Sequence, residues 1–223
     1  MEKPRYITAW RVTAVLYVIA SFATGGYVLL IGGPPARGAG GFAGALFLLV
    51  FPLLRRIFRL KKVPLMDAVL TVFLFLAFDL GTVLGLYSYI WWMDLAAHGL
   101  SGFLFTMVGL CLYWMIREEK RAPMGKDALA AASYAFFFSS FIAALWEIFE
   151  YVAFLVTGHD SQNVAATGVG DTMEDIMICL AGSLVMAALI YLHLKGKHRS
   201  FLLLPAEEFY RANYGLERDG GRG

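Results

Sequence analysis

The sequence predicts an all-α fold: a polytopic membrane protein built as a six-transmembrane-helix bundle, N-in and C-in. Of its 223 residues, 59% are hydrophobic and 16% are charged, and the mean hydropathy is +0.65. A soluble domain of this composition would expose more apolar surface than water tolerates. Six apolar runs have roughly the 20-residue length that crosses a bilayer as a helix, and the basic residues gather in alternate connections between them.

Each apolar run is expected to form one membrane-spanning helix. The run that ends near Arg55 and Arg56 is the weakest, although long basic side chains can reach the membrane interface. Before it, the glycine-rich stretch from Gly32 to Gly44 predicts a turn. The six predicted spans are 12–31, 40–57, 69–90, 95–116, 129–156 and 171–194.

These helices are predicted to form a single transmembrane domain, residues 1–204. The remaining residues, 205–223, are rich in charge and end in Gly-Gly-Arg-Gly. This composition predicts a cytoplasmic tail with a short surface helix followed by partial disorder.

The distribution of lysine and arginine predicts the orientation, because positively charged loops stay in the cytoplasm. With the N-terminus inside, only Arg37 falls on the outer side, and Trp91 and Trp92 fit the outer aromatic belt. We therefore expect a multi-pass protein of the plasma (inner) membrane with both termini cytoplasmic. The short, dispersed basic patches argue against a nucleic-acid partner. The residues collected inside are Lys3, Arg5, Arg11, Arg55, Arg56, Arg59, Lys61, Lys62, Arg117, Lys120, Arg121, Lys126, Lys195, Lys197 and Arg199.

Three consecutive predicted helices each carry a pair of polar residues near the predicted outer side. Each pair is spaced three or four residues apart, so both members share one helix face. If the three helices pack together, all six side chains could converge on one volume in the outer half of the bilayer. The pairs are Asp94 and His98, Glu147 and Glu150, and Asp171 and Asp175.

Five carboxylates and one histidine at this depth carry more negative charge than they can neutralise among themselves, and no lysine or arginine lies at the same depth. Isolated charges in the membrane are costly and are expected to pair, bind cations or stay protonated. We therefore predict that all six residues are ligands of a divalent metal ion. Oxygen ligands with one imidazole suit Zn, Mn, Fe, Mg or Ca.

A structural role is the alternative for each residue. Asp171 or Asp94 could cap its helix, Asp175 could be solvated in the first turns, and His98 could be a neutral histidine bonded across helices. The carboxylates of Glu147 and Glu150 are hardest to explain in this way, because both lie within an apolar helix.

Other polar residues have less defined roles. Asp79 lies near the middle of its predicted span and could join the same cluster, serve a proton path or be a protonated acid bonded to a neighbour. His159 and Asp160 could form a lid or a solvated loop. Ser101 is assigned to helix packing.

The ordered set of motifs resembles the YjdF-like family of bacterial inner-membrane proteins. The motifs are Asp-x-x-x-His at 94–98, Glu-x-x-Glu at 147–150 and Gly-Asp-Thr-x-x-Asp at 170–175. They cover roughly the second half of the chain. The resemblance implies a polytopic membrane protein and no particular reaction.

Three functions are compatible with these residues. The first is a metal-dependent hydrolase that acts on a lipid or lipid-linked substrate, with Glu147 or Glu150 as the catalytic general base. The second is a cation or proton transporter that uses the same carboxylates. The third is a non-catalytic membrane assembly subunit in which the polar cluster only holds helices together. Inward from the cluster, only Asp79 and scattered serine and threonine residues such as Ser139 and Ser140 are available, which favours a site over a pathway.

Overall fold

A computed structural model describes residues 4–117, 125, 127–158 and 160–215 of the chain. These residues are predominantly helical and contain no strand, and six of their helices are long and apolar enough to cross a membrane. The prediction of an all-α bundle with six membrane-spanning helices is thereby confirmed. Several predicted features lie outside the described residues: Lys3, Lys120, Arg121, Lys126, His159 and the end of the tail, 216–223.

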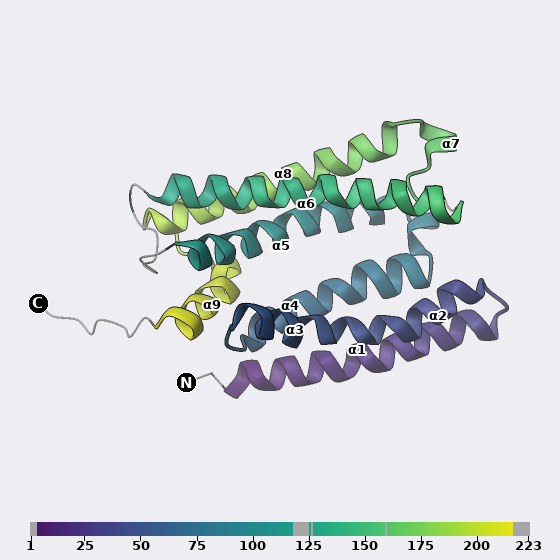
Figure 1. Cartoon of the computed structure of the whole chain (residues 1–223), viewed down its shortest axis with the longest axis horizontal. Helices are drawn as coiled ribbons and strands as arrows, with labels where there is room; N and C mark the ends of the chain where they lie inside the picture. The colour runs from purple at the N-terminus through teal and green to yellow at the C-terminus, as the bar shows by residue number, and fades with distance from the viewer. Residues whose placement is uncertain (1–3, 118–124, 126, 159, 216–223) are drawn as a thin grey trace, which may run out of the picture. The chain divides into compact units, whose positions relative to one another are not determined.

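The chain divides into two compact units. The N-terminal unit contains the described residues up to Met93 together with those from Leu204 onward, and the central unit runs from Asp94 to Leu203. Figure 1 shows the helices of which each unit consists.

The N-terminal unit begins with a pair of closely packed helices, α1 (Pro4–Leu30) and α2 (Pro35–Gly44). The predicted turn was too long, because the glycine-rich stretch is helical from Pro35 onward. Its glycines serve helix contact: a Cβ added to Gly41 would lie 2.5 Å from the Gly25 Cα. Small residues let two helix backbones approach in this way, so the turn shrinks to the residues around Gly32, whose φ is +73°.

The second span continues through a short 3₁₀ segment, η1 (Ala45–Leu49), into α3 (Val50–Phe58). It ends at Arg59, which has a left-handed backbone conformation. The Arg55 guanidinium contacts both carboxylate oxygens of Asp67, at 2.9 and 2.7 Å. Asp67 lies in the first turn of α4 (Pro64–Leu74). Arg55 is a charged residue at the end of an otherwise apolar run. Its ion pair with Asp67 thus joins α3 to α4.

The third span is shifted toward the N-terminus relative to the prediction of 69–90. It comprises α4 and a π-helical segment, η2 (Phe75–Val83). Gly85, with φ +74°, ends it, and a short 3₁₀ turn, η3 (Leu86–Ser88), follows. Asp79 therefore lies within five residues of the end of its span, not near the middle.

The tail contributes a helix of its own, α9 (Leu204–Tyr214). It packs against α4, and the Asn213 side-chain oxygen accepts a hydrogen bond from the Lys61 backbone N–H at 2.7 Å. The first part of the tail is thus an integral piece of the N-terminal unit.

The central unit contains three long helices, α5 (Met93–Ile116), α6 (Asp127–Thr157) and α8 (Gly170–Leu194). These bounds agree with the predicted spans to within two residues. A single-turn helix, α7 (Val164–Thr167), lies between α6 and α8, and a 3₁₀ turn, η4 (Phe201–Leu203), closes the unit. Figure 1 shows α6 and α8 running side by side.

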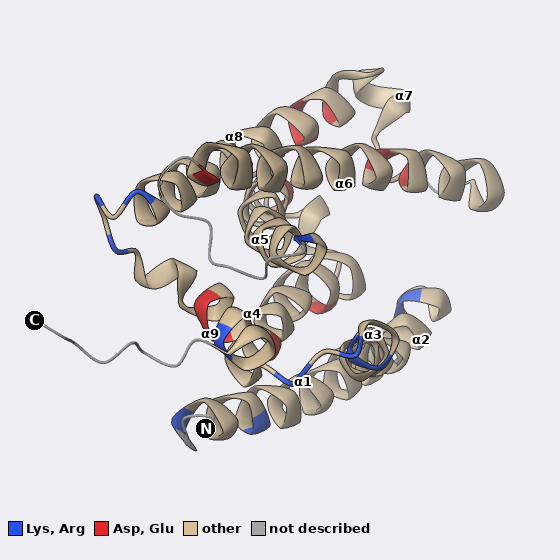
Figure 2. Ribbon diagram, turned by 60° about the vertical axis from the view of Figure 1, so that its left-hand side comes forward, with Lys and Arg blue, Asp and Glu red and all other residues tan. Residues whose placement is uncertain are grey.

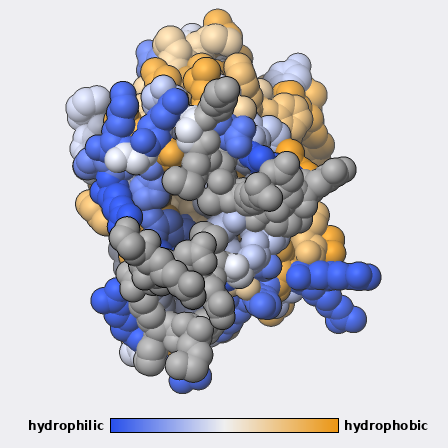
Figure 3. Space-filling model, turned by 90° about the vertical axis from the view of Figure 1, so that its left-hand side faces the viewer, coloured by the Kyte–Doolittle hydropathy of each residue, from blue (hydrophilic) through white to orange (hydrophobic). Residues whose placement is uncertain are grey.

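Charge is segregated along the helices of each unit, as Figure 2 shows by colour. In the N-terminal unit, basic residues gather where α1 begins and where α3 is followed by α4. Hydrophilic residues cover much of the face of the molecule that Figure 3 shows. In the central unit, Arg117 and Lys195 follow the ends of α5 and α8, whereas acidic residues occupy the opposite ends of these helices. This segregation is the pattern on which the predicted orientation rests.

Candidate metal centre

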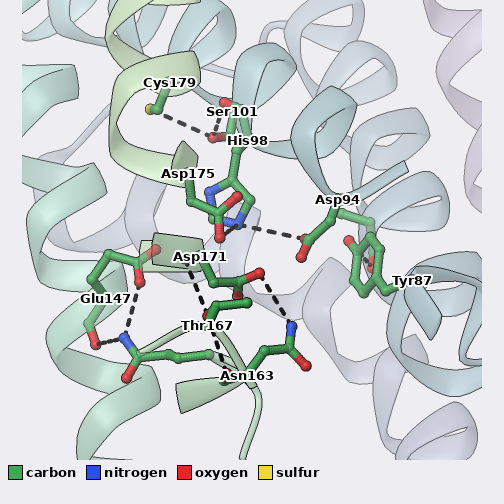
Figure 4. A network of polar contacts seen from close by, with 12 residues as sticks. Tyr87, Asp94, His98, Ser101, Glu147, Asn163, Thr167, Asp171, Asp175 and Cys179 are labelled. Atoms are coloured by element: carbon green, nitrogen blue, oxygen red, sulfur yellow. Dashed lines mark hydrogen bonds and ion pairs between the residues drawn. The ribbon is translucent and has the colours of Figure 1, made fainter. Parts of the chain in front are cut away.

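The first turns of α5 and α8 place three ligand-type side chains together. Asp94 and His98 lie one turn apart on α5, and Asp175 faces them from α8 (Figure 4). One ligand atom from each of the three lies within 4.8 Å of the other two. Nε2 of His98 is 3.6 Å from Oδ1 of Asp94 and 3.7 Å from Oδ2 of Asp175. We call these three residues the Asp–His–Asp group.

These separations distinguish two arrangements. A direct hydrogen bond from an imidazole nitrogen to a carboxylate is about 2.7–3.2 Å long, so neither pair is bonded directly. Two ligand atoms that share a tetrahedral ion at 2.0–2.1 Å lie about 3.4 Å apart. The spacing of the Asp–His–Asp group therefore fits ligands around a common ion better than it fits a histidine held by two aspartates.

Close helix packing brings the two halves of the group within reach. A Cβ added to Gly102 of α5 would lie 2.1 Å from the Cys179 backbone oxygen of α8, and one added to Gly182 would lie equally close to the Gly99 oxygen. Only glycine permits this approach of two backbones. Because His98 and Asp175 project from the same contact, their spacing depends on these glycines.

A buried hydroxyl network fastens the third long helix to the other two. Ser183 of α8 donates to Ser139 of α6 at 2.9 Å, and Ser139 in turn donates to the Gly102 backbone oxygen of α5 at 2.9 Å. All three residues are buried. Satisfied buried networks of this kind rigidify a bundle, so the helices that carry the acidic residues are held at fixed spacing.

Glu147 of α6 is held by the chain segment between α6 and α8. It is only 6% exposed, and the Gln162 side-chain amide donates to its Oε2 at 2.9 Å and to its backbone oxygen at 3.0 Å. Gln162 is itself buried. Glu147 is thus oriented by a residue for which the sequence offers no motif.

The same segment contacts α8. Asn163, in a left-handed conformation with φ +49°, donates from Nδ2 to Oδ1 of Asp171 at 3.1 Å. The Asp160 carboxylate accepts hydrogen bonds from the backbone N–H groups of Val164 and Ala165, each at 2.9 Å. Asp160 therefore caps α7, while the side chains of Gln162 and Asn163 donate hydrogen bonds to Glu147 and Asp171.

A known family of membrane proteins matches the chain across these spans. The family model described as "Predicted membrane protein (DUF2238)" matches residues 10–196. The chain belongs to this family. It is the same family as the YjdF-like one, so the resemblance predicted from the motifs is confirmed. No curated protein matches the chain, and no solved structure does.

All six residues predicted as ligands lie within residues 10–196, which the family model matches. The structure divides these six residues into two sets. Asp94, His98 and Asp175 form the Asp–His–Asp group. Glu147, Glu150 and Asp171 flank it. Asp171 is the second residue of α8 and makes no capping hydrogen bond, because the helix begins at Gly170. Asp171 is therefore not the N-cap residue, which is Val169, but its carboxylate lies in the first turn, where a negative charge is favourable.

The flanking carboxylates remain close enough to act on the group electrostatically. Glu147, Glu150 and Asp171 are near enough to Asp175 for their charges to act on its carboxyl group. Within the part of the chain that the structure describes, no lysine or arginine forms an ion pair with any of these residues. The site thus gathers five carboxyl groups without a lysine or arginine partner among the described residues. A divalent cation bound by the Asp–His–Asp group would balance the charge of those that are ionised.

Two other polar residues of the predicted helices stand outside this chemistry. The Ser101 hydroxyl donates to the His98 backbone oxygen at 2.8 Å and lies 3.8 Å from the Cys179 sulfur. The Ser101 hydroxyl thus contacts its own helix, α5, and the neighbouring α8, which agrees with a role in helix packing. Asp79 lies in the N-terminal unit and bonds there to Thr24.

Proposed function

We propose that this family member is a metal-dependent membrane hydrolase in which Asp94, His98 and Asp175 bind a divalent metal ion. The observation that carries the proposal is the spacing of 3.6 and 3.7 Å from the His98 Nε2 to the two aspartates. Two carboxylates and one imidazole leave coordination positions for water and substrate, as in catalytic metal sites. Zn, Mn or Fe suits the mixed oxygen and nitrogen ligands better than Mg or Ca, which prefer oxygen alone.

The protein side chains would divide the remaining work. When bound, the ion would activate water and polarise the scissile group of the substrate. Glu147, fixed by Gln162, would keep its position next to the group and help to orient the ligands. Glu150 is half-buried, and its carboxylate is the better placed of the two to accept and return a proton as general base.

The surroundings of the site favour a lipid or lipid-linked substrate. On α6, Trp146 and Phe149 alternate with the two glutamates and are 49% and 59% exposed. In a bilayer, this face would contact acyl chains. A substrate with a polar head and an apolar tail could place its head at the acidic residues while its tail stays beside α6.

The basic residues support the localisation that we propose. By the positive-inside rule, their distribution favours a multi-pass protein of the plasma (inner) membrane with both termini in the cytoplasm. The Asp–His–Asp group, at the opposite end of the central unit, would then face the outer leaflet. The substrate would be reached from the extracytoplasmic side.

A transport pathway through the central unit has less support. Inward from the acidic residues, the buried hydroxyls of Ser139, Ser183 and Thr106 already donate hydrogen bonds within the helix bundle. Beyond them, the interior contains Met107, Leu110, Met186 and Ile190, all fully buried and apolar. An ion would have no ligands along that stretch.

Elemental analysis of the purified protein tests the proposal. Wild-type protein should contain stoichiometric transition metal, and His98→Gln and Asp175→Asn should each lower the metal content at least tenfold. The matched control is Glu174→Gln, because Glu174 is an exposed carboxylate next to Asp175. Full metal occupancy in both site variants would contradict the proposal, as would equal loss in the control.

A further inference from the structure

The N-terminal unit contains a second group of buried oxygen atoms. Asp79, on the π-helical segment η2, has no exposed surface, and neither has Ser21 of α1. The Thr24 hydroxyl of α1 donates to Asp79 Oδ1 at 3.2 Å. The Tyr17 hydroxyl also lies near the Asp79 carboxylate and donates to the Gly44 backbone oxygen at 2.9 Å. We call these four side chains the Asp79 cluster.

Two atoms of the cluster have no hydrogen-bond partner. They are Oδ2 of Asp79 and Oγ of Ser21, and both are fully buried. An unsatisfied buried polar atom costs about 1–3 kcal/mol, and a charged one costs more. The Ser21 hydroxyl lies close to the Asp79 carboxyl group, although neither Ser21 Oγ nor Asp79 Oδ2 makes a hydrogen bond of standard geometry. A cation bound between them would satisfy both oxygen atoms.

The charge and chemistry of the cluster define the guest. Within the described residues, Asp79 makes no ion pair with a lysine or arginine. The other members of the cluster are neutral hydroxyls, which present oxygen lone pairs. A hard cation prefers such oxygen ligands. One carboxylate balances one positive charge, whereas a divalent ion would leave a buried positive charge uncompensated.

The backbone at Asp79 is also irregular. The segment Phe75–Val83 is π-helical, and the Leu84 N–H bonds to the Asp79 backbone oxygen five residues back, at 3.0 Å. Gly81 lets the Tyr87 ring pack against the segment, and the Tyr87 hydroxyl donates to the Ala77 oxygen at 2.7 Å. Short π-helical segments are rare and frequently occur at functional sites.

We propose that the Asp79 cluster binds a small monovalent cation, Na⁺, between Asp79 Oδ2 and the Ser21 hydroxyl. Thr24 and Tyr17 complete the oxygen lining. This site lies in a different unit from the Asp–His–Asp group and takes a different class of ion. It therefore does not depend on the proposed hydrolase activity.

Thermal unfolding of the full-length purified protein in detergent tests the site. A ligand that binds only the folded state raises its stability in proportion to the logarithm of ligand concentration. We expect the midpoint temperature of wild-type protein to rise with NaCl, at constant ionic strength maintained with choline chloride, and to rise less with KCl. Direct binding of ²²Na⁺ to the same sample should saturate.

Variants connect the response to the cluster. Asp79→Asn and Ser21→Ala should each lower the Na⁺ affinity at least tenfold, and Ser21→Ala preserves the carboxylate if Asp79→Asn folds poorly. Thr13→Ala is the matched control, because its hydroxyl bonds only within α1. An undiminished Na⁺ response in both site variants would overturn the proposal. It would also be overturned if choline and Na⁺ acted equally, since the cluster would then hold a proton or water instead.

Discussion

Gln162 bonds to Glu147 twice, to the carboxylate and to the backbone oxygen of the same residue. The two residues are 15 positions apart, and both are buried. The paired contact fixes the segment after α6 against the helix that it has just left. It also holds a glutamate that would otherwise be a buried carboxylate with an unbonded Oε2.

Replacing Gln162 should destabilise the protein. Gln162→Ala leaves the Glu147 carboxylate without its donor, which should cost about 1–3 kcal/mol, and Gln162→Glu should cost more because two carboxylates would meet. Thermal unfolding in detergent measures the difference. Val169→Ala, at a 65% exposed position of the same connection, should leave the midpoint unchanged. Equal midpoints for Gln162→Ala and wild type would show that the contact does not hold the segment.

The glycines between α5 and α8 should tolerate substitution unequally. Gly102→Ala would place a Cβ 2.1 Å from the Cys179 backbone oxygen, so the helices must separate. Gly99→Ala would place one 3.5 Å from an Ile178 side-chain carbon and 3.9 Å from the Ile178 backbone oxygen, which are ordinary van der Waals contacts. We expect Gly102→Ala to cost about 1–3 kcal/mol or more, as overpacking does, and Gly99→Ala to cost much less. Comparing the two thermal midpoints tests this. Similar midpoints would contradict the close helix contact.

The buried ion pair of the N-terminal unit gives a third prediction. Asp67 is 5% exposed, so Arg55→Ala should remove the guanidinium that contacts both of its carboxylate oxygens, at a cost of about 3–5 kcal/mol. Arg56→Ala serves as the control, because Arg56 is exposed. Replacing both members of the pair with apolar residues should destabilise less than Arg55→Ala alone. A double variant as unstable as the single one would mean that the unpaired charge is not the cause.

Hydropathy and spacing predict much of this structure because the bilayer imposes helix length and the helix imposes periodicity. The bounds of α5, α6 and α8 follow from their apolar runs, and Asp94 and His98 share a face because they are four residues apart. The third span was misplaced because hydropathy does not register where a backbone leaves the helix. Gly85, in a left-handed conformation, ends it while the sequence remains apolar.

The rest of the candidate site depends on contacts between segments. Gln162 and Asn163 look like ordinary polar loop residues, and only the return of the chain from α6 to α8 brings them to Glu147 and Asp171. Likewise, the sequence shows Asp79 only as an acidic residue within an apolar span, as it does for the other acidic residues. Its partner is Thr24, 55 positions earlier in the chain, and no periodicity within one helix can indicate such a pairing.

The orientation of the chain decides which side of the membrane the acidic residues face, and cysteine labelling can test it. Cys111 and Cys179 are both buried, so they should react little with a membrane-impermeant maleimide. Trp92→Cys, at a 53% exposed position, should be labelled in intact cells, because the positive-inside rule places it outside. Lys197→Cys, also at an exposed position, should be labelled only after the membrane is opened. The reverse pattern would place the Asp–His–Asp group on the cytoplasmic side, and its substrate would then have to come from the inner leaflet.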